Sequence, residues 1–261
     1  MPEPAAAERL EAEGFLDVFR LPLEARAVYI HLLWRPPDLR ARILYVDRDT
    51  LGRSMSYCVP LTALRLVRRE SCLRLVRLNQ DRGRLELWAN LRFSLFERMV
   101  IFYGAFVAMK RQDQMESPLE LDDWFDSGEK EEIRGEIEDG HRGFVHEFRV
   151  LKDPDSRCVR LEARVIRGRF KGVPVWTAFV TRHIGSRSWM RRLGRVVEIT
   201  DLQPYVFCDN YTLPRGSTGT YRLHFASQRG KYRHATWIQL MLIVIADAES
   251  LMYDFHRISF R

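Results

Sequence analysis

The amino-acid sequence repeats two short phrases in the same order, and this repeat limits the fold more than any other feature. Residues 59–64 read Val-Pro-Leu-Thr-Ala-Leu and residues 197–202 read Val-Glu-Ile-Thr-Asp-Leu, so both follow the pattern Val-x-[Leu/Ile]-Thr-x-Leu. Downstream, residues 91–94 (Leu-Arg-Phe-Ser) and residues 223–227 (Leu-His-Phe-Ala-Ser) each precede an apolar stretch. Either phrase alone occurs by chance in many chains, but the shared order predicts two copies of one small domain. Each copy is expected to end in a strand followed by a helix.

Length and composition agree with two globular domains. The chain has 261 residues, of which 46% are hydrophobic and 30% are charged, as in ordinary folded proteins. Its longest apolar stretches, residues 99–109 and 240–246, are shorter than the roughly 18–20 residues of a membrane-spanning helix. The acidic N-terminus has no hydrophobic region of the kind found in secretory signals. We therefore expect no transmembrane segment and a cytoplasmic location, with a membrane-peripheral or nuclear location as the alternatives.

The cysteines also favour a reducing compartment. Cys58, Cys72, Cys158 and Cys208 are scattered and contain no Cys-x-x-Cys pair. A chain of this size can be stabilised by its hydrophobic core without disulfides. We predict reduced thiols, and a disulfide between the two repeats is the alternative.

Charge is distributed unevenly along the chain, which has a formal net charge of +7. Residues 112–139 contain twelve Asp and Glu but two basic residues, whereas residues 140–261 contain twenty-one Lys and Arg and ten Asp and Glu. Most of the positive charge is arginine, which suits bidentate contacts to phosphate or carboxylate. These shifts predict four segments: an N-terminal helical extension (1–22), a first domain (23–112), an acidic connector (113–140) and a second domain (141–261).

Hydrophobic periodicity predicts mostly strands, with one clear helix in the first domain. Residues 26–34 alternate as in a half-buried strand, Pro36 to Asp38 break this pattern, and residues 42–46 complete a hairpin. Ser94 and Glu97 have the spacing of a capping box, and an apolar helical face follows them. The second domain has a similar sequence of strand-like segments and a weaker capping box at residues 236–239 before an apolar helix.

A hairpin, further antiparallel strands and a final strand leading into one amphipathic helix resemble the pleckstrin-homology superfold. The chain as a whole is similar to tandem pleckstrin-homology-like proteins of filamentous fungi, and the resemblance rests on residues 85–112 and 221–245. It implies an α+β, mainly β, fold with two partly open antiparallel barrels, each closed by a C-terminal helix. Such domains bind phosphoinositide headgroups, peptides or other proteins, and the fold alone does not select among these ligands.

The resemblance suggests a first candidate site at a basic hairpin. Lipid-binding members of the superfold place basic residues on the first hairpin, with a basic-x-basic pair on its second strand. Arg35, Arg40 and Arg42 match that layout. Since Arg40 and Arg42 are two residues apart, a strand would point both to one face, where they could bind adjacent phosphates. The alternative is a solvated basic edge.

A second candidate site lies in residues 182–195, which hold five arginines, no carboxylate and a Trp-Met pair. A basic loop with an apolar tip suits an anionic membrane surface, and the same composition suits nucleic acid or an acidic peptide. The alternative is an indole buried under the loop, with the arginines facing water. The ligand-binding residues predicted here are Arg187, Trp189, Arg191, Arg192 and Arg195.

No motif for catalysis is present. The histidines are spread along the chain without metal-ligand spacing, and residues 215–219 lack the lysine and helix of a phosphate-binding loop. We therefore predict no catalytic residues, no metal site and no cofactor. The expected function is a non-catalytic adaptor that binds acidic lipid headgroups or an acidic protein partner. The alternative is a chromatin-associated or nucleic-acid-binding factor of the histone-chaperone type.

Overall fold

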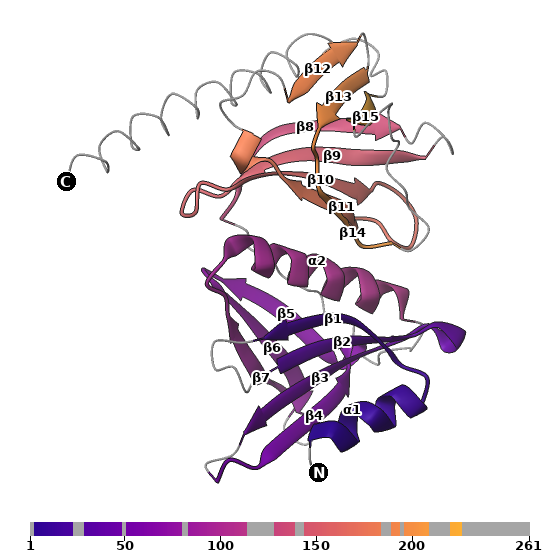
Figure 1. Cartoon of the computed structure of the whole chain (residues 1–261), viewed down its shortest axis with the longest axis vertical. Coiled ribbons are helices and arrows are strands. Elements are labelled where there is room, and N and C mark those ends of the chain that lie inside the picture. Colours follow the sequence, from indigo (N-terminus) through magenta and orange to yellow (C-terminus); the bar gives the residue numbers. More distant parts are fainter. Residues whose placement is uncertain are drawn as a thin grey trace, which may run out of the picture. The chain divides into compact units, whose positions relative to one another are not determined.

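The computed structural model of the chain describes residues 3–22, 29–48, 51–79, 83–113, 128–138, 144–183, 189–193, 196–208 and 220–225. The chain divides into two compact units, Met1–Ser127 and Gly128–Arg261. Both consist mainly of antiparallel strands (Figure 1), and each has its own hydrophobic core.

The first unit contains two sheets and two α-helices. In chain order its elements are α1 (Glu3–Ala12), β1 (Leu16–Pro22), β2 (Tyr29–Arg35), η1 (Pro36–Asp38), β3 (Arg40–Arg48), β4 (Ser54–Pro60), η2 (Leu61–Ala63), β5 (Leu64–Arg69), β6 (Cys72–Asn79), β7 (Arg84–Arg92) and α2 (Phe96–Gln112). One sheet has the strand order β1-β2-β3-β4 and the other has the order β5-β6-β7.

Alternating side chains explain how these sheets enclose a core. On β3, Ile43 contributes to the main core of the unit, whereas the neighbouring Leu44 faces a second cluster that includes Leu10 of α1. The helix α2 packs on the main core through Phe102 and Phe106, both fully buried, and Figure 1 shows it running along the sheets. The predicted apolar helix is therefore confirmed.

The second unit contains one continuous sheet. Its elements are β8 (Lys130–Glu138), β9 (Val145–Lys152), β10 (Val159–Val165), β11 (Pro174–Phe179), η3 (Thr181–His183), β12 (Met190–Leu193), β13 (Val196–Thr200), β14 (Pro204–Val206) and β15 (Thr220–Phe225). The strand order is β12-β13-β15-β8-β9-β10-β11-β14.

The two units share one arrangement of strands. In both, four consecutive strands form a meander (β1 to β4 and β8 to β11), a short 3-10 helix follows, and a group of three strands comes next. In the second unit, pairing of β15 with β8 joins the two groups, and β14 adds a strand beside β11. The described strands form open sheets, and no closed barrel is found among them.

The repeated phrases map onto this arrangement unequally. Leu91 lies in β7 and Leu223 lies in β15, the last strand of each three-stranded group, and both side chains are buried. Residues 59–64, however, cover the end of β4, η2 and the start of β5, whereas residues 197–202 cover β13 and the turn after it. The first phrase therefore matches between the copies by letters only, although the duplication that it suggested is present.

Two predicted segments belong instead to the sheets. Part of the predicted N-terminal extension forms β1, which pairs with β2. Within β1 only Leu21 is buried, so its sequence lacks the apolar alternation by which a strand is predicted. Part of the predicted acidic connector forms β8, which pairs with β9. There, the ion pairs Glu131–Arg149 and Glu147–Arg134 cross between the strands, so Glu131 of the predicted connector is paired within the sheet.

The predicted capping box is wrong at the start of α2. The N-cap residue is Leu95, and it makes no side-chain capping bond. The helix begins one residue too late for Ser94 to be its cap. The predicted turn at residues 36–38 is present as η1, and all four cysteines are thiols without a disulfide. The predicted C-terminal helix of the second unit, with the capping box at residues 236–239, lies outside the described residues.

Candidate functional site

The first predicted site lies at the turn between β2 and β3. Arg35 donates from Nε and Nη2 to the two carboxylate oxygens of Asp38, at 2.8 and 2.5 Å. Hydrogen bonding from Arg35 lowers the pKa of the Asp38 carboxyl below its ordinary value. Arg40 Nε lies 3.7 Å from Asp38 Oδ2, and the guanidinium groups of Arg35 and Arg42 lie 4.7 and 5.3 Å from the ring centroid of Phe15. The structure gathers the three arginines around partners within the same unit.

The location of this turn also differs from the predicted layout. Because β1 precedes it, the hairpin of β2 and β3 is the second hairpin of the meander. Successive turns of an antiparallel meander lie at alternate ends of the sheet. Arg35, Arg40 and Arg42 therefore lie at the end opposite to the turns that join β1 to β2 and β3 to β4.

The second predicted site has its aromatic residue in the core. Trp189 is 5% exposed, and its ring stacks on His183 with 5.5 Å between centroids. Met190 is 6% exposed, because β12 pairs with β13 and places Met190 opposite Ile199. The expectation of an apolar tip exposed on this loop is wrong, and the alternative of an indole buried as local core describes it.

Among the binding arginines predicted in that segment, Arg191 has a described side chain, and it has a carboxylate partner. Arg191 Nη2 donates to Glu198 Oε2 at 2.7 Å, and Arg222 Nε donates to the other oxygen at 2.8 Å. These hydrogen bonds lower the pKa of the Glu198 carboxyl. The remaining predicted residues lie outside the described side chains: Arg187, Arg192 and Arg195.

A basic surface that the sequence analysis missed lies at the turn between β10 and β11. Arg167, Arg169, Phe170 and Lys171 are all exposed, and residues 166–173 contain no carboxylate. Within the described part of the chain, none of the three cations forms an ion pair. The guanidinium of Arg169 lies 5.7 Å from the ring centroid of Phe170. The run Arg-Gly-Arg-Phe-Lys between two predicted strands was the signal that could have located this turn.

The backbone of this turn is held by internal hydrogen bonds. The amide of Gly172 donates to the carbonyl of Val165 at 2.8 Å, and the amide of Lys171 donates to the carbonyl of Gly168 at 3.1 Å. Gly168 and Gly172 both have φ of +81°, a conformation that glycine adopts without the steric cost of a side chain. The cations are therefore presented on an ordered turn.

Exposed apolar residues flank the turn. Val165 at the end of β10 pairs with His146 near the start of β9, so the residues before β9 leave the sheet beside the β10–β11 turn. There, Phe144 is 58% exposed and Val145 is 38% exposed. Together with residues 167–171 they form what we call the mouth surface: Phe144, Val145, Arg167, Arg169, Phe170 and Lys171.

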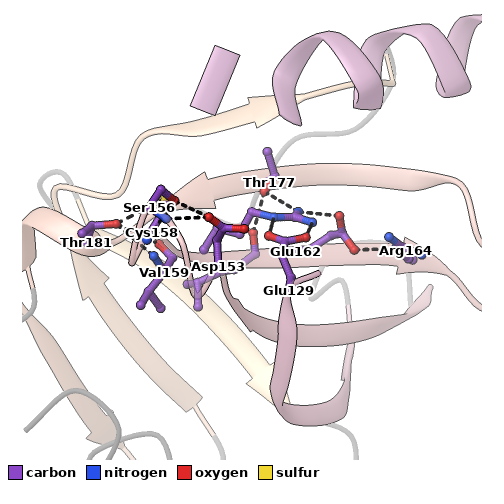
Figure 2. A network of polar contacts seen from close by, with 11 residues as sticks. Glu129, Asp153, Ser156, Cys158, Val159, Glu162, Arg164, Thr177 and Thr181 are labelled. Atoms are coloured by element: carbon purple, nitrogen blue, oxygen red, sulfur yellow. Dashed lines mark hydrogen bonds and ion pairs between the residues drawn. The ribbon is translucent and has the colours of Figure 1, made fainter. Parts of the chain in front are cut away.

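A buried polar network runs along β10, from the end opposite the mouth surface toward Arg164 (Figure 2). The Arg160 guanidinium donates to both oxygens of Glu129, at 2.7 and 2.8 Å, and to Glu162 Oε2 at 2.5 Å. It also donates to Thr177 Oγ1 at 3.2 Å, and Arg164 pairs with the second oxygen of Glu162. Two guanidinium groups and two carboxylates thus balance one another within the network.

The charges of this network are strongly coupled. Burial alone would raise the pKa of Glu162, but Arg160 and Arg164 outweigh burial and lower it to about 2. The side chains of Arg160 and Glu129 are 2% and 0% exposed. Glu129 lies two residues after the boundary between the units, so the network attaches the start of the second unit to β10. A stabilising role explains all of these contacts without a ligand.

Comparison with protein families agrees with the division of the chain. A family described as a PH domain found in tandem in fungal proteins matches residues 3–129, and its C-terminal counterpart with the same description matches residues 130–241. The chain belongs to the fungal tandem PH-domain proteins. The two matches meet within two residues of the boundary between the units. No curated protein and no solved structure matches the chain.

PH domains typically act as non-catalytic binding modules, so this membership indicates a binding role. The first PH domain uses the arginines of its β2–β3 turn internally, whereas the second PH domain exposes the cations of its mouth surface. Among the described residues, no helix has the length and apolar character needed to cross a bilayer. Within the same part of the chain, no group of three or more candidate ligand side chains is arranged to hold a metal.

Proposed function

We propose that this tandem PH-domain protein is a non-catalytic adaptor that docks on an anionic membrane surface through the mouth surface of its second PH domain. The observation that carries the proposal is the ordered β10–β11 turn, which exposes Arg167, Arg169 and Lys171 without any carboxylate. This turn lies at the same end as the β8–β9 turn, the first hairpin of its meander. The superfold's lipid-binding members carry basic residues on that hairpin.

The apolar residues of the mouth surface support a membrane rather than a free anion as the ligand. Phe144 is 58% exposed and Phe170 is 37% exposed, on adjacent turns. Aromatic side chains are stable at the boundary between headgroups and acyl chains. Phosphate groups would bind the guanidinium groups of Arg167 and Arg169, while the two rings enter the boundary region.

The residues predicted from sequence alone have no part in this proposal. Arg35 and Arg40 lie beside Asp38, Arg42 lies over Phe15, and Arg191 pairs with Glu198. Binding a lipid phosphate there would compete with contacts that already exist. Among the described residues the mouth cations form no ion pair, and Arg169 lies over the ring of Phe170.

The test measures binding of the full chain to vesicles of neutral lipid, of neutral lipid with phosphatidylserine, and of neutral lipid with a phosphoinositide. The variant is Arg167→Ala/Arg169→Ala/Lys171→Ala. The matched control is Arg69→Ala/Arg74→Ala/Arg92→Ala, which removes the same charge from exposed positions of the first PH domain. Each cation near an anionic surface contributes about 1 kcal/mol, so the mouth variant loses about 3 kcal/mol, on the order of a hundredfold in Kd.

Each outcome decides the proposal. Binding to anionic vesicles that falls with added salt, is lost in the mouth variant and persists in the control supports it. Equal binding by the mouth variant and the unaltered chain overturns it. Phosphatidylserine and phosphoinositide vesicles separate general surface charge from headgroup recognition within the same experiment.

The histone-chaperone alternative has less support. It required residues 113–140 to act as an acidic binding segment, but β8 occupies residues 130–138 and pairs with β9. Glu131 and Glu132 of this strand form ion pairs with Arg149 and Lys130. These carboxylates already form ion pairs, so they are less suited to bind the basic side chains of a histone.

A further inference from the structure

One face of the small sheet in the first PH domain concentrates positive charge. In β5 and β6, Leu64, Leu66, Leu73 and Leu75 are fully buried and face the core. Side chains alternate along a strand, so the residues between them face the opposite side. The pairing register places Arg65 beside Val76 and Val67 beside Arg74 on that outer side.

A β-bulge extends the outer face onto β7. The pairing of β6 with β7 shifts between Leu75 and Val76, so that Ala89 lies opposite Leu75 and Leu87 lies opposite Val76. A bulge re-aims the residues that follow it. As a result Leu87 is 60% exposed and Leu85 is 42% exposed. On the other side of the bulge, register pairs Asn90 with Arg74 and Arg92 with Cys72.

We name this set the outer face. Its described side chains are Arg65, Val67, Arg69, Cys72, Arg74, Val76, Leu85, Leu87, Asn90 and Arg92. Arg65, Val67 and Arg69 alternate along β5, Arg74 and Val76 alternate along β6, and Leu85 and Leu87 lie together on β7. The set contains four arginines and no carboxylate.

The arginines of the outer face have no internal counter-charges. Among the residues that the structure describes, Arg65, Arg69, Arg74 and Arg92 form no ion pair. The Nε of Arg65 is buried and makes no hydrogen bond within the described chain. No two of these arginines lie directly opposite each other in the register, but they gather on one face without a counter-charge. An acidic group that covers the face lowers their mutual repulsion.

We propose that the outer face binds an acidic, amphipathic segment of a partner protein. Carboxylates of that segment would lie on Arg69, Arg74 and Arg92, and its apolar residues would lie on Val76 and Leu87. The site is on the first PH domain and is separate from the mouth surface, so it gives the adaptor a second, protein-directed contact. The charge and apolar pattern of the face select this partner class.

The same pattern argues against the other anionic partners. Single-stranded nucleic acid is held by aromatic side chains that stack on bases, and the outer face contains none. A membrane interface favours aromatic anchors, and the outer face has none among its described side chains; Leu85 and Leu87 are its protruding apolar residues. A protein segment can offer carboxylates and aliphatic groups with the alternation that the face presents.

The test is a selection of displayed random peptides on the full chain, followed by measurement of Kd for the recovered peptides. The variant is Arg69→Ala/Arg74→Ala/Arg92→Ala, whose side chains are exposed, so folding is retained and circular dichroism checks it. The matched control is Arg167→Ala/Arg169→Ala/Lys171→Ala, with the same loss of charge. A second variant, Leu87→Ser, tests the apolar contact without changing charge.

The expected result is a set of peptides rich in Asp, Glu and aliphatic residues. Their affinity falls at least tenfold in the Arg69/Arg74/Arg92 variant and falls in Leu87→Ser, and it is unchanged in the control. The proposal is overturned if no recovered peptide depends on these arginines. It is also overturned if a single-stranded oligonucleotide or a phosphatidylserine vesicle depends on them and the peptides do not. Vesicle binding through the mouth surface is read separately, so either proposal can fail alone.

Discussion

Replacing Arg160 with methionine tests the buried polar network most directly. Arg160 donates to both oxygens of Glu129 and to Glu162, and these three side chains are between 0% and 4% exposed. Methionine fills a similar volume without a charge. The variant therefore leaves the carboxylates of Glu129 and Glu162 buried without their main partner, and only Arg164 still pairs with Glu162.

The expected loss of stability is about 3–5 kcal/mol, the usual cost of removing one partner of a buried ion pair. An independent figure comes from Glu162. Its pKa is lowered from an ordinary 4.5 to about 2, and each tenfold change in acidity corresponds to about 1.4 kcal/mol, so Arg160 and Arg164 together outweigh the cost of burying the Glu162 charge by about 3 kcal/mol. The two figures agree in magnitude.

The pH dependence of the loss has a definite sign. A carboxyl whose pKa is lower in the folded state stabilises the fold above its unfolded pKa, and this contribution is lost as the pH falls toward the folded value. The unaltered domain therefore loses the Glu162 contribution between about pH 5 and pH 2. In Arg160→Met the buried carboxylates are better tolerated when protonated. The difference in stability between the two proteins is thus largest near pH 7 and shrinks on acidification.

Amide hydrogen exchange in increasing urea measures the stability of the second PH domain within the full chain, for the unaltered protein and for Arg160→Met. Peptides from β9 to β11 report the second PH domain, and peptides from β5 to β7 report the first domain as an internal reference. The variant Glu129→Gln/Arg160→Met/Glu162→Gln removes all three charges and is expected to recover most of the loss, because no uncompensated carboxylate remains. A loss below about 1 kcal/mol in Arg160→Met would refute the buried, fully charged network.

Three further predictions concern single positions. Trp189→Ala destabilises the second PH domain by about 3–5 kcal/mol, because it removes a buried indole stacked on His183; thermal unfolding measures this, and an unchanged Tm contradicts the buried placement. Gly172→Ala destabilises the folded turn by about 1–2 kcal/mol because φ is +81° there, whereas Gly172→Asn destabilises it less since asparagine tolerates that conformation. We therefore expect the alanine variant to bind vesicles more weakly than the asparagine variant. Burial and a hydrogen bond to Asp47 raise the pKa of Tyr45 to about 12. Ultraviolet titration of Tyr45→Phe is therefore expected to lack one phenol that ionises late in the unaltered chain. Identical titration curves of the two proteins above about pH 11 would contradict this environment.

The duplication was predictable from sequence, but the placement of its strands was not. The spacing of apolar residues located β2, β3 and the helix α2, because their buried residues recur at the period of a strand or of a helix. In contrast, β1 buries only Leu21, and β8 buries Ile133 and Ile137 among glutamates. Both become strands by pairing with a neighbour, a tertiary effect that local propensity does not contain. Because β1 was not predicted, the hairpin of β2 and β3 was counted as the first hairpin of the domain. The predicted site at Arg35, Arg40 and Arg42 therefore lies on the second turn of the meander.

Counting arginines could not separate those that bind internal partners from those that face solvent. Arg160 pairs with Glu129 across 31 residues and Arg149 with Glu131 across 18 residues, so only the register of distant strands reveals these pairs. The same register leaves the arginines of the outer face and of the mouth surface without carboxylates. Among the described residues, the mouth surface and the outer face each gather several exposed cations without a carboxylate, and the proposed adaptor would use the first for a membrane and the second for a partner protein.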